Sequence, residues 1–365
     1  VRYQIWYTKD SSYVNWLPAD TITDTTYKHL ITEGGIRYKY HIRAYTDRNT
    51  AYVSNSNIDS VASLFVDEPL YGYLQYATVL ASNQVELQYY RDTVIKVNGY
   101  TLYRGTDKKV LAPVEYVPVE DAENDEVKLY DISADVNGAD YYYQVIVQNA
   151  CDLDVSPSNL ARSIHLQLDA RDEGLRNVLT WNRYQEWDST VAYYNLYRSE
   201  NGEYPTKLYK VVEPDTLYDY TTFVDDIFDE IQAKGKFCYR VEAVQGPINS
   251  KVVNDYPNEL QPAVSSSNMV CATTEPLIYV PNAFAPDGVN KRFGPQGRFF
   301  DFTKYEMVIF NRWGEQVFET RNVNIGWDGT INGEDAGVGS YVYMIRYTDA
   351  DGNEERIKGT VTLLR

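Results

Sequence analysis

Three stretches of the chain repeat the same order of hydrophobic and polar positions at intervals of roughly 100 residues. Each begins with an alternating run, which starts at Tyr3 (YQIWYTKD), Tyr100 (YTLYRGTD) and Tyr194 (YNLYRSENG). A second run with strict alternation follows in each, from Tyr38 (YKYHIRAY), Tyr141 (YYYQVIVQ) and Phe237 (FCYRVEAV). Because a period of two is typical of half-buried strands, the pattern predicts three related β modules.

A unit of about 100 residues with several short strands has the size of a β-sandwich. The order of the runs resembles fibronectin type III modules, in which Trp181 of NVLTWNRY would be a buried core residue. The resemblance implies modules at 66–170 and 171–274 and a partial module at 1–65, which lacks an early strand. Because Val1 opens directly onto an alternating run, we expect the chain to be the C-terminal part of a longer protein. Such modules are most often spacers or binding platforms, and the fold alone implies no chemistry.

The pattern changes near residue 275, where Pro276, Pro281 and Pro286 argue against a central strand. Alternating runs return in KYEMVIFNRWG, YVYMIRYT and RIKGTVTLLR, so a fourth β domain is predicted at 275–365. Because glycine takes the positive φ that tight turns require, hairpin turns are expected at Gly314, at Asp328–Gly329 and in DADGN. Alternation places Tyr305, Met307 and Ile309 on one face of the first run. It likewise places Tyr341, Tyr343, Ile345 and Tyr347 on one face of the second run.

Five blocks of this last segment carry a second resemblance: VPNAFAPDG, YEMVIFNRWGEQVFE, GWDGT, GSYVYMIRYTDADG and KGTVTLLR. In this order they resemble the gliding-motility-associated C-terminal domain of Bacteroidota, the type B sorting domain of the type IX secretion system. One loop departs from the family's N-A-F-T-P-N-G-D-G-x-N-D pattern. NAFAPDGVNKRF, from Asn282, is shorter by two residues and has Lys291 where an aspartate is usual. Any partner contact or cation site of that loop is therefore not carried over.

The resemblance implies a role for the whole chain. The sorting domain would route the protein through the periplasm to the type IX translocon, and it would then engage an outer-membrane β-barrel of the PorP/SprF type at the cell surface. The best known carriers are giant surface adhesins used in gliding, so the resemblance also suggests a surface glycan or a host or substratum molecule as a ligand that upstream regions would bind. We therefore expect an all-β protein of tandem fibronectin type III/Ig-like sandwiches followed by a small sorting sandwich. Exported enzymes with an upstream catalytic domain and arrays of carbohydrate-binding modules are the alternatives.

Candidate partner-binding residues in the sorting domain are aromatic and arginine side chains, which dominate interfaces, and residues of its turns and C-terminus. They are Arg312, Trp313, Gly314, Trp327, Asp328, Gly329, Tyr341, Leu363, Leu364 and Arg365. For Trp313 and Trp327 a place in the core is favoured, because a domain of about ninety residues needs large side chains to fill it. Strand addition along TVTLLR is a second docking mode, since that strand ends at the last residue.

Three cysteines allow one intramolecular disulfide. Cys238 and Cys271, 33 residues apart, fall on strands expected to be neighbours, and a bond between them would add about 3 kcal/mol of stability. Two reduced, buried thiols are the alternative. Cys151 is then a free thiol or the partner of a cysteine upstream.

Composition argues against several other functions. The formal net charge of −18 disfavours binding to nucleic acid or anionic lipid. Only three histidines are present, His29 and His41 in the first module and His165 in the second, which makes a catalytic or metal-binding histidine cluster implausible. Neither G-x-S-x-G, a phosphate-binding glycine loop nor C-x-x-C occurs, so we expect no catalysis, cofactor or metal. DADGN resembles the start of a calcium loop but lacks the distal glutamate, which favours a plain turn.

Six short triplets resemble the O-glycosylation site of Bacteroidota, an aspartate followed by Ser or Thr and then an apolar residue or Thr. The candidate hydroxyls belong to Thr21, Thr25, Ser60, Thr93, Ser189 and Thr216. Chance matches are the alternative in a chain rich in Asp and Thr.

Overall fold

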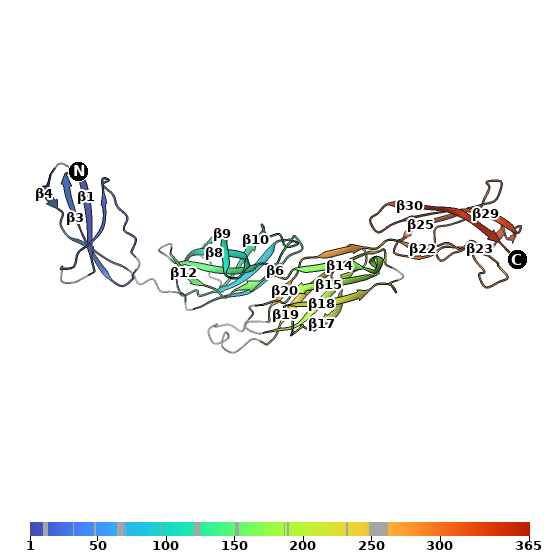
Figure 1. Ribbon diagram of the computed structural model, residues 1–365, viewed down its shortest axis with the longest axis horizontal. Coiled ribbons are helices and arrows are strands. Elements are labelled where there is room, and N and C mark those ends of the chain that lie inside the picture. The colour runs from blue at the N-terminus through green and yellow to red at the C-terminus, as the bar shows by residue number, and fades with distance from the viewer. Residues whose placement is uncertain are drawn as a thin grey trace. The chain divides into compact units, whose positions relative to one another are not determined.

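The computed structural model describes residues 1–9, 14–31, 33–46, 49–63, 69, 71–95, 97–119, 125–149, 153–185, 187, 190–230, 233–247 and 262–365. These residues form strands, turns and a single 3₁₀ turn, η1 (Asp172–Gly174), which confirms the predicted all-β class (Figure 1). Across the described ranges, no helix has the length and hydrophobicity needed to cross a membrane. Cys151 and Ser189 lie outside the described residues.

The chain divides into two compact units. The first consists of Val1–Pro69 with the segments Val94–Gly99 and Val147–Ser156, and the second consists of Leu70–Thr93, Tyr100–Ile146 and Pro157–Arg365. Within Val1–Pro69, the strands of the first unit form one antiparallel sheet in the order β2-β1-β3-β4, with β5 also paired to β3. Its strands are β1 (Arg2–Thr8), β2 (Leu17–Ile22), β3 (Arg37–Thr46), β4 (Asn49–Asn55) and β5 (Asp59–Ala62).

The next strands form two antiparallel sheets. β6 (Gly72–Val79), β7 (Val85–Arg91) and β10 (Glu126–Asp131) make a three-stranded sheet in the order β10-β7-β6. The other sheet, in the order β12-β11-β8-β9 with β13 on β11, contains β8 (Val97–Asp107), β9 (Val110–Pro118), β11 (Tyr142–Asn149), β12 (Asp154–Pro157) and β13 (Ala161–Arg162). Alternate residues of β11 are buried, among them Tyr143 and Val145, as the sequence pattern predicts.

The same arrangement recurs in the following strands, here called the third module. One sheet, in the order β14-β15-β18, contains β14 (Leu166–Arg171), β15 (Arg176–Asn182) and β18 (Tyr220–Asp226). The second contains β16 (Val191–Ser199), β17 (Leu208–Val212), β19 (Lys236–Gln245), β20 (Val264–Ser266) and β21 (Val270–Thr273). Trp181 is 1% exposed and meets Tyr194 edge-on, with ring centroids 5.4 Å apart, so it is the core residue that the sequence predicts.

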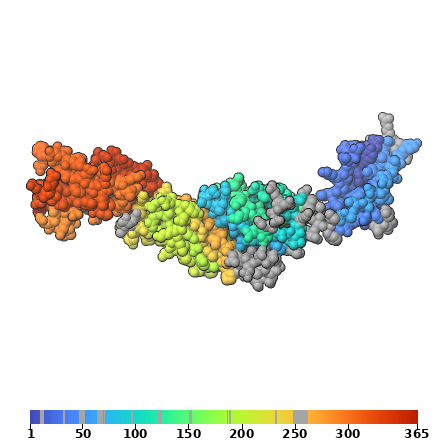
Figure 2. Space-filling model, turned by 180° about the vertical axis from the view of Figure 1, so that it is seen from behind, coloured from blue at the N-terminus to red at the C-terminus, as the bar shows by residue number. Residues whose placement is uncertain are grey.

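The C-terminal strands form the terminal domain, shown in orange and red in Figure 2. Its main sheet, in the order β23-β30-β29-β25-β26, contains β23 (Ala283–Phe284), β25 (Asp301–Phe310), β26 (Gln316–Thr320), β29 (Gly339–Thr348) and β30 (Glu354–Leu363). Two short pairs accompany it, β22 (Leu277–Tyr279) with β24 (Gln296–Arg298), and β27 (Thr330–Ile331) with β28 (Glu334–Asp335). Met307, Ile309 and Ile345 are fully buried on one face, as the alternation predicts.

Candidate docking surface of the terminal domain

A tight hairpin joins β25 to β26 and presents an exposed tryptophan. The turn closes with a backbone hydrogen bond from Asn311 to Glu315 (2.9 Å), and Gly314 has the predicted positive φ of 84°. The Oδ1 atom of Asn311 also accepts hydrogen bonds from the backbone N–H groups of Trp313 (2.9 Å) and Glu315 (3.0 Å). The backbone of Trp313 is therefore held in place while its side chain is 82% exposed.

The two tryptophans of this segment have opposite environments. Trp327 is completely buried, donates from Nε1 to the carbonyl of Thr330 (2.9 Å), and packs against Phe284 and Tyr341. The favoured core position is thus correct for Trp327. It is wrong for Trp313, because a residue in the turn lies beyond the end of the sheet, where no other element of the terminal domain covers it.

The GWDGT turn positions Trp327 beside the final strand. Gly329 has a φ of 81°, and a Cβ there would lie 3.0 Å from Pro286 and 3.1 Å from Leu363. Asp328 accepts hydrogen bonds from the side chain and backbone of Thr330, which lower the pKa of its carboxyl. The residues that turn the chain between β27 and β28 are Asn332 and Gly333, which follow GWDGT. The predicted hairpin position at Asp328–Gly329 is therefore wrong, although the positive φ of Gly329 is confirmed.

The end of the final strand lies inside the sheet. Ala283 and Phe284 of β23 pair in parallel with Thr362 and Leu363, and the N–H of Leu364 donates to the carbonyl of Phe284 (2.9 Å). Strand addition at the chain's end is therefore excluded in this fold, because β23 already occupies that edge. In the terminal domain, which is fully described, residues Glu354–Val361 of β30 have no strand partner on their outer edge. This part of the strand carries several charged side chains, which are typical of an edge that is protected from further strand pairing.

Six of the ten candidate partner-binding residues are exposed: Arg312, Trp313, Gly314, Asp328, Leu364 and Arg365. The other four are buried: Trp327, Gly329, Tyr341 and Leu363. A Cβ on Gly339 would lie 3.3 Å from Nη2 of Arg312, and Gly339 is the strand partner of Leu363. The turn of Trp313 and the last residues of the chain thus lie at the same end of the main sheet.

Two exposed apolar residues at this end were not among the candidates. Val338 is 59% exposed and precedes Gly339, and Val342 is 47% exposed opposite Phe310. Alternation gives a signal for Val342, since it lies between Tyr341 and Tyr343 and must face the other way. We call the surface formed by Arg312, Trp313, Val338, Leu364 and Arg365 the end surface.

The DADGN turn shows how its carboxylates are used. Asp349 Oδ1 accepts hydrogen bonds from the N–H groups of Asp351 (3.0 Å) and Asn353 (2.7 Å), so this side chain closes the hairpin between β29 and β30. The favoured plain turn is therefore correct. In the part of the chain that the structure describes, no group of three His, Cys, Asp or Glu residues is arranged to hold a metal ion.

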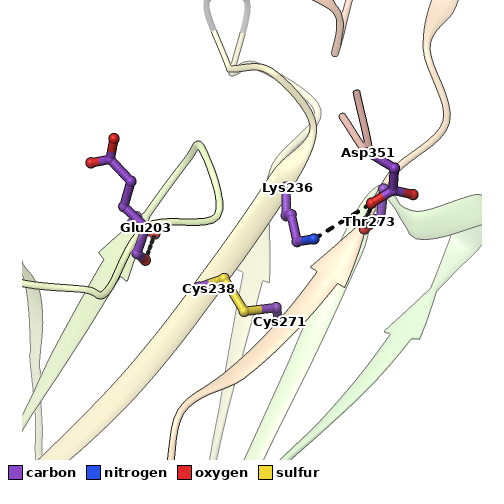
Figure 3. The surroundings of a disulfide bond; sticks show 7 residues. Glu203, Lys236, Cys238, Cys271, Thr273 and Asp351 are labelled. Atoms are coloured by element: carbon purple, nitrogen blue, oxygen red, sulfur yellow. Dashed lines mark hydrogen bonds and ion pairs between the residues drawn. A yellow bond between two sulfur atoms is a disulfide. The ribbon is translucent and has the colours of Figure 1, made fainter. Parts of the chain in front are cut away.

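A disulfide joins Cys238 of β19 to Cys271 of β21, where the spacing of the cysteines predicts it (Figure 3). The two residues are direct cross-strand partners with Cα atoms 4.1 Å apart. Figure 3 shows Lys236, Thr273 and Asp351 close to the bond. Disulfides persist in oxidising compartments, so the bond is compatible with an exported protein.

The candidate glycosylation sites that the structure describes are all exposed: Thr21, Thr25, Ser60, Thr93 and Thr216. In two of them the preceding aspartate accepts a hydrogen bond from the N–H of the candidate residue, Asp20 to Thr21 (2.7 Å) and Asp59 to Ser60 (2.8 Å). Asp215 instead caps Leu217 (2.8 Å), whose side chain is 85% exposed. Exposure makes these hydroxyls accessible, and their modification stays a prediction.

Comparison with known proteins identifies the terminal domain. Residues 278–363 match the family model described as CHU_C type IX secretion signal domain. No curated protein matches the chain. A solved structure, a tetra-tandem repeat in the extending region of a large adhesion protein, is similar at 14% identity and a TM-score of 0.29, covering 100% of this chain and 92% of that one. Residues 278–363 therefore form a type IX secretion signal domain, and the chain that carries them is exported to the cell surface or the extracellular space.

Proposed function

We propose that this chain is the non-catalytic C-terminal region of an adhesin-like surface protein of Bacteroidota. Its terminal domain is recognised by the type IX translocon and then docks, through the end surface, to an outer-membrane β-barrel of the PorP/SprF type. The docked barrel keeps the protein attached at the outer membrane, where gliding motility uses such adhesins. The preceding sandwiches act as a spacer that carries upstream ligand-binding regions.

The exposed ring of Trp313 carries this proposal. Tryptophan and arginine contribute most to interfaces when a partner buries them, and here Arg312 and Trp313 are adjacent on one turn. The hydrogen bonds from Asn311 fix the backbone of the turn, so that binding requires little ordering of the chain. Leu364 and Val338 add apolar area at the same end of the sheet.

A spacer role is supported by contacts between successive sandwiches in the second unit. Trp187 of the third module donates from Nε1 to the carbonyl of Gln75 in β6 (2.7 Å). The N–H of Ala77 donates to the hydroxyl of Tyr184 (3.1 Å), and the hydroxyl of Ser265 donates to the carbonyl of Ala77 (2.7 Å). These buried contacts limit bending at this junction, as a spacer requires.

Surface display in the native host tests the proposal. Trp313→Ala in the full-length protein should leave the domain folded and lower its affinity for the outer-membrane partner by about tenfold or more. The matched control is Tyr279→Ala, which removes a ring that is 65% exposed in the same domain. The readouts are the surface-bound fraction by antibody labelling of intact cells and the protein that co-purifies from outer membranes. Unchanged retention of the Trp313 variant would remove the end surface as the docking site.

Binding to glycans is a second candidate function for the third module. Tyr218 and Tyr220 are 55% and 47% exposed, and their rings stack with centroids 5.3 Å apart at 25°. Exposed aromatic faces can pack against the apolar faces of sugars. The test is a glycan array probed with the whole chain and with Tyr218→Ala. Binding that the variant loses supports this function, and absence of binding by the whole chain argues against it.

A further inference from the structure

Two adjacent phenylalanines of the terminal domain are buried in two different hydrophobic cores. Phe300 is 1% exposed and packs against Phe302 and Tyr347 of the terminal domain. Phe299 is completely buried, but it belongs to the core of the third module. There it meets Phe237 of β19 edge-on, with ring centroids 6.1 Å apart. The peptide between the two residues therefore connects both cores.

The backbone at Phe299 is adapted to this position. Its φ of 65° lies in the left-handed region, which a bulky residue rarely adopts. Such a conformation persists only where the surroundings determine it, and here it directs the ring toward the third module. Gly235 faces it with a φ of 96°, and a Cβ on that glycine would lie only 3.1 Å from the Cβ of Phe299. The glycine thus provides the space that the phenylalanine fills.

Polar contacts surround the buried ring. Lys234 forms an ion pair with Asp301 (3.4 Å) and Lys236 forms one with Asp351 (3.5 Å). The hydroxyl of Thr273 lies 3.4 Å from the same carboxylate of Asp351 (Figure 3). In addition, the guanidinium of Arg298 stacks on the ring of Phe228 at 4.5 Å. Each exposed pair contributes little by itself, but together they fix one rotation of the domain about the buried ring.

The disulfide of the third module is adjacent in sequence to residues that contact the terminal domain. Cys238 follows Phe237 on β19, and Cys271 lies two residues before Thr273 on β21. The disulfide therefore links the strand of Phe237, which contacts the ring of Phe299, to the strand of Thr273, which belongs to the polar contacts around that ring.

We infer that the third module is a built-in docking partner of the secretion signal domain, and that Phe299, seated against Gly235 and Phe237, locks the two into one rigid body. The secretion signal is then presented as a two-domain unit in a single orientation. This inference goes beyond the proposed function and does not depend on it, because the lock is a property of the purified chain without any translocon or outer-membrane partner.

Residual dipolar couplings of the deuterated full chain test the lock. In the unaltered protein, the third module and the terminal domain should report the same alignment tensor. Phe299→Gly removes the ring and also relieves the left-handed backbone, so both domains should stay folded while their tensors become different. Two different tensors in the unaltered protein would overturn the inference, and so would one shared tensor in the variant.

A second variant changes the third module instead of the terminal domain, at the glycine that contacts Phe299. Gly235→Ala leaves the terminal domain's sequence unchanged but places a Cβ against Phe299, and it should separate the two tensors in the same way. Tyr279→Ala, which removes an exposed ring outside both cores, is the control and should leave them equal. Thermal unfolding gives an independent readout, because the locked pair should unfold in one transition and both lock variants in two. A single transition in all proteins, with folded chemical shifts retained, would contradict the lock.

Discussion

Asp131 and Asp225 occupy equivalent positions in two successive sandwiches, and each is a buried carboxylate that accepts hydrogen bonds from an arginine and a tyrosine at equivalent positions. For Asp131 these are Arg104 (2.6 Å) and Tyr143 (3.0 Å), and for Asp225 they are Arg198 (3.0 Å) and Tyr239 (2.8 Å), while Asp225 also accepts one from Tyr209 (2.7 Å). The arginine lies on the first alternating strand of each module and the tyrosine on the second. The repeat in the sequence thus forms the same polar cluster in both sandwiches, with the arginine and the tyrosine on one sheet and the aspartate on the opposite sheet.

Replacing Asp225 should test how much this cluster contributes. Asp225→Asn removes the buried counter-charge of Arg198, which is 8% exposed and keeps its ion pairs with Glu200 and Glu230, and we expect a loss of about 2 kcal/mol in the free energy of unfolding. Urea unfolding measures the change. Asp169→Asn is the matched control, because the Asp169–Arg171 pair is well exposed and its loss should cost at most about 0.5 kcal/mol.

Asp131 should make the stability of its sandwich depend on pH. Burial alone would raise the pKa of its carboxyl, but hydrogen bonds from Ser133 and Arg104 outweigh burial and hold the pKa below its ordinary value of 3.8. A group with a lowered folded pKa stabilises the fold above its unfolded pKa, and this contribution is lost as the pH falls through the folded pKa. Unfolding free energies measured from pH 6 downward should fall below about pH 4. Asp131→Asn should weaken the dependence of the unfolding free energy on pH in this range. An unchanged dependence would contradict the role given to Asp131.

Reduction of the disulfide should destabilise the third module. The bond closes a loop between residues 33 apart, so replacing both Cys238 and Cys271 by alanine should cost about 3 kcal/mol. Thermal unfolding with and without dithiothreitol measures this. The dithiol gives two electrons and two protons to the disulfide, which becomes two thiols while the reagent forms a cyclic disulfide. The double variant should show no response of this kind, and equal shifts in both proteins would contradict the prediction.

Alanine substitutions at three glycines of the terminal domain should distinguish the cost of backbone strain from the cost of steric crowding. Gly337 lacks a positive φ and has open space around its Cα, so Gly337→Ala should be nearly neutral or slightly stabilising. Gly333 has a φ of 86° in open space, and alanine there should cost about 1 kcal/mol. Gly329→Ala should cost more, because it adds contacts with Pro286 and Leu363. Chemical unfolding of the three variants checks this order, and equal losses would show that crowding at Gly329 does not matter.

Glycosylation can be tested on the native protein by intact-mass measurement. We expect added hexose mass that decreases in Thr216→Val, because this hydroxyl and the neighbouring Leu217 are exposed on one loop. Thr180→Val is the control, since that threonine lies in a strand and does not follow an aspartate. A native mass equal to that of the unmodified chain would exclude modification at all six candidate positions.

Most strands could be predicted from the sequence, because alternation follows directly from which side of a sheet is buried. Leu102, Leu196 and Ile309 are all completely buried at positions that the pattern selects. The disulfide was predictable for a similar reason, since neighbouring strands of one sheet place Cys238 and Cys271 side by side. These features depend on local periodicity and short-range order along the chain.

The rest depends on contacts that periodicity does not encode. The exposure of Trp313 is decided by the absence of a covering element, and a turn residue carries no alternation from which to predict it. Phe299 lies between β24 and β25, and its burial is decided by Gly235 in another module. Asp225 is one acid among many in its module, and only the packing of two sheets shows that an arginine and two tyrosines surround it.

The disulfide also limits how far the third module can lengthen under a pulling force. The sequence separation of 33 between Cys238 and Cys271 corresponds to roughly 110 Å of extended chain, which the closed loop cannot release under tension. Tension that enters through β19 passes to β21 across a covalent bond, without loading the hydrogen bonds between these two strands. A surface protein anchored through its terminal domain would therefore have a module of limited extensibility directly beside the anchored domain.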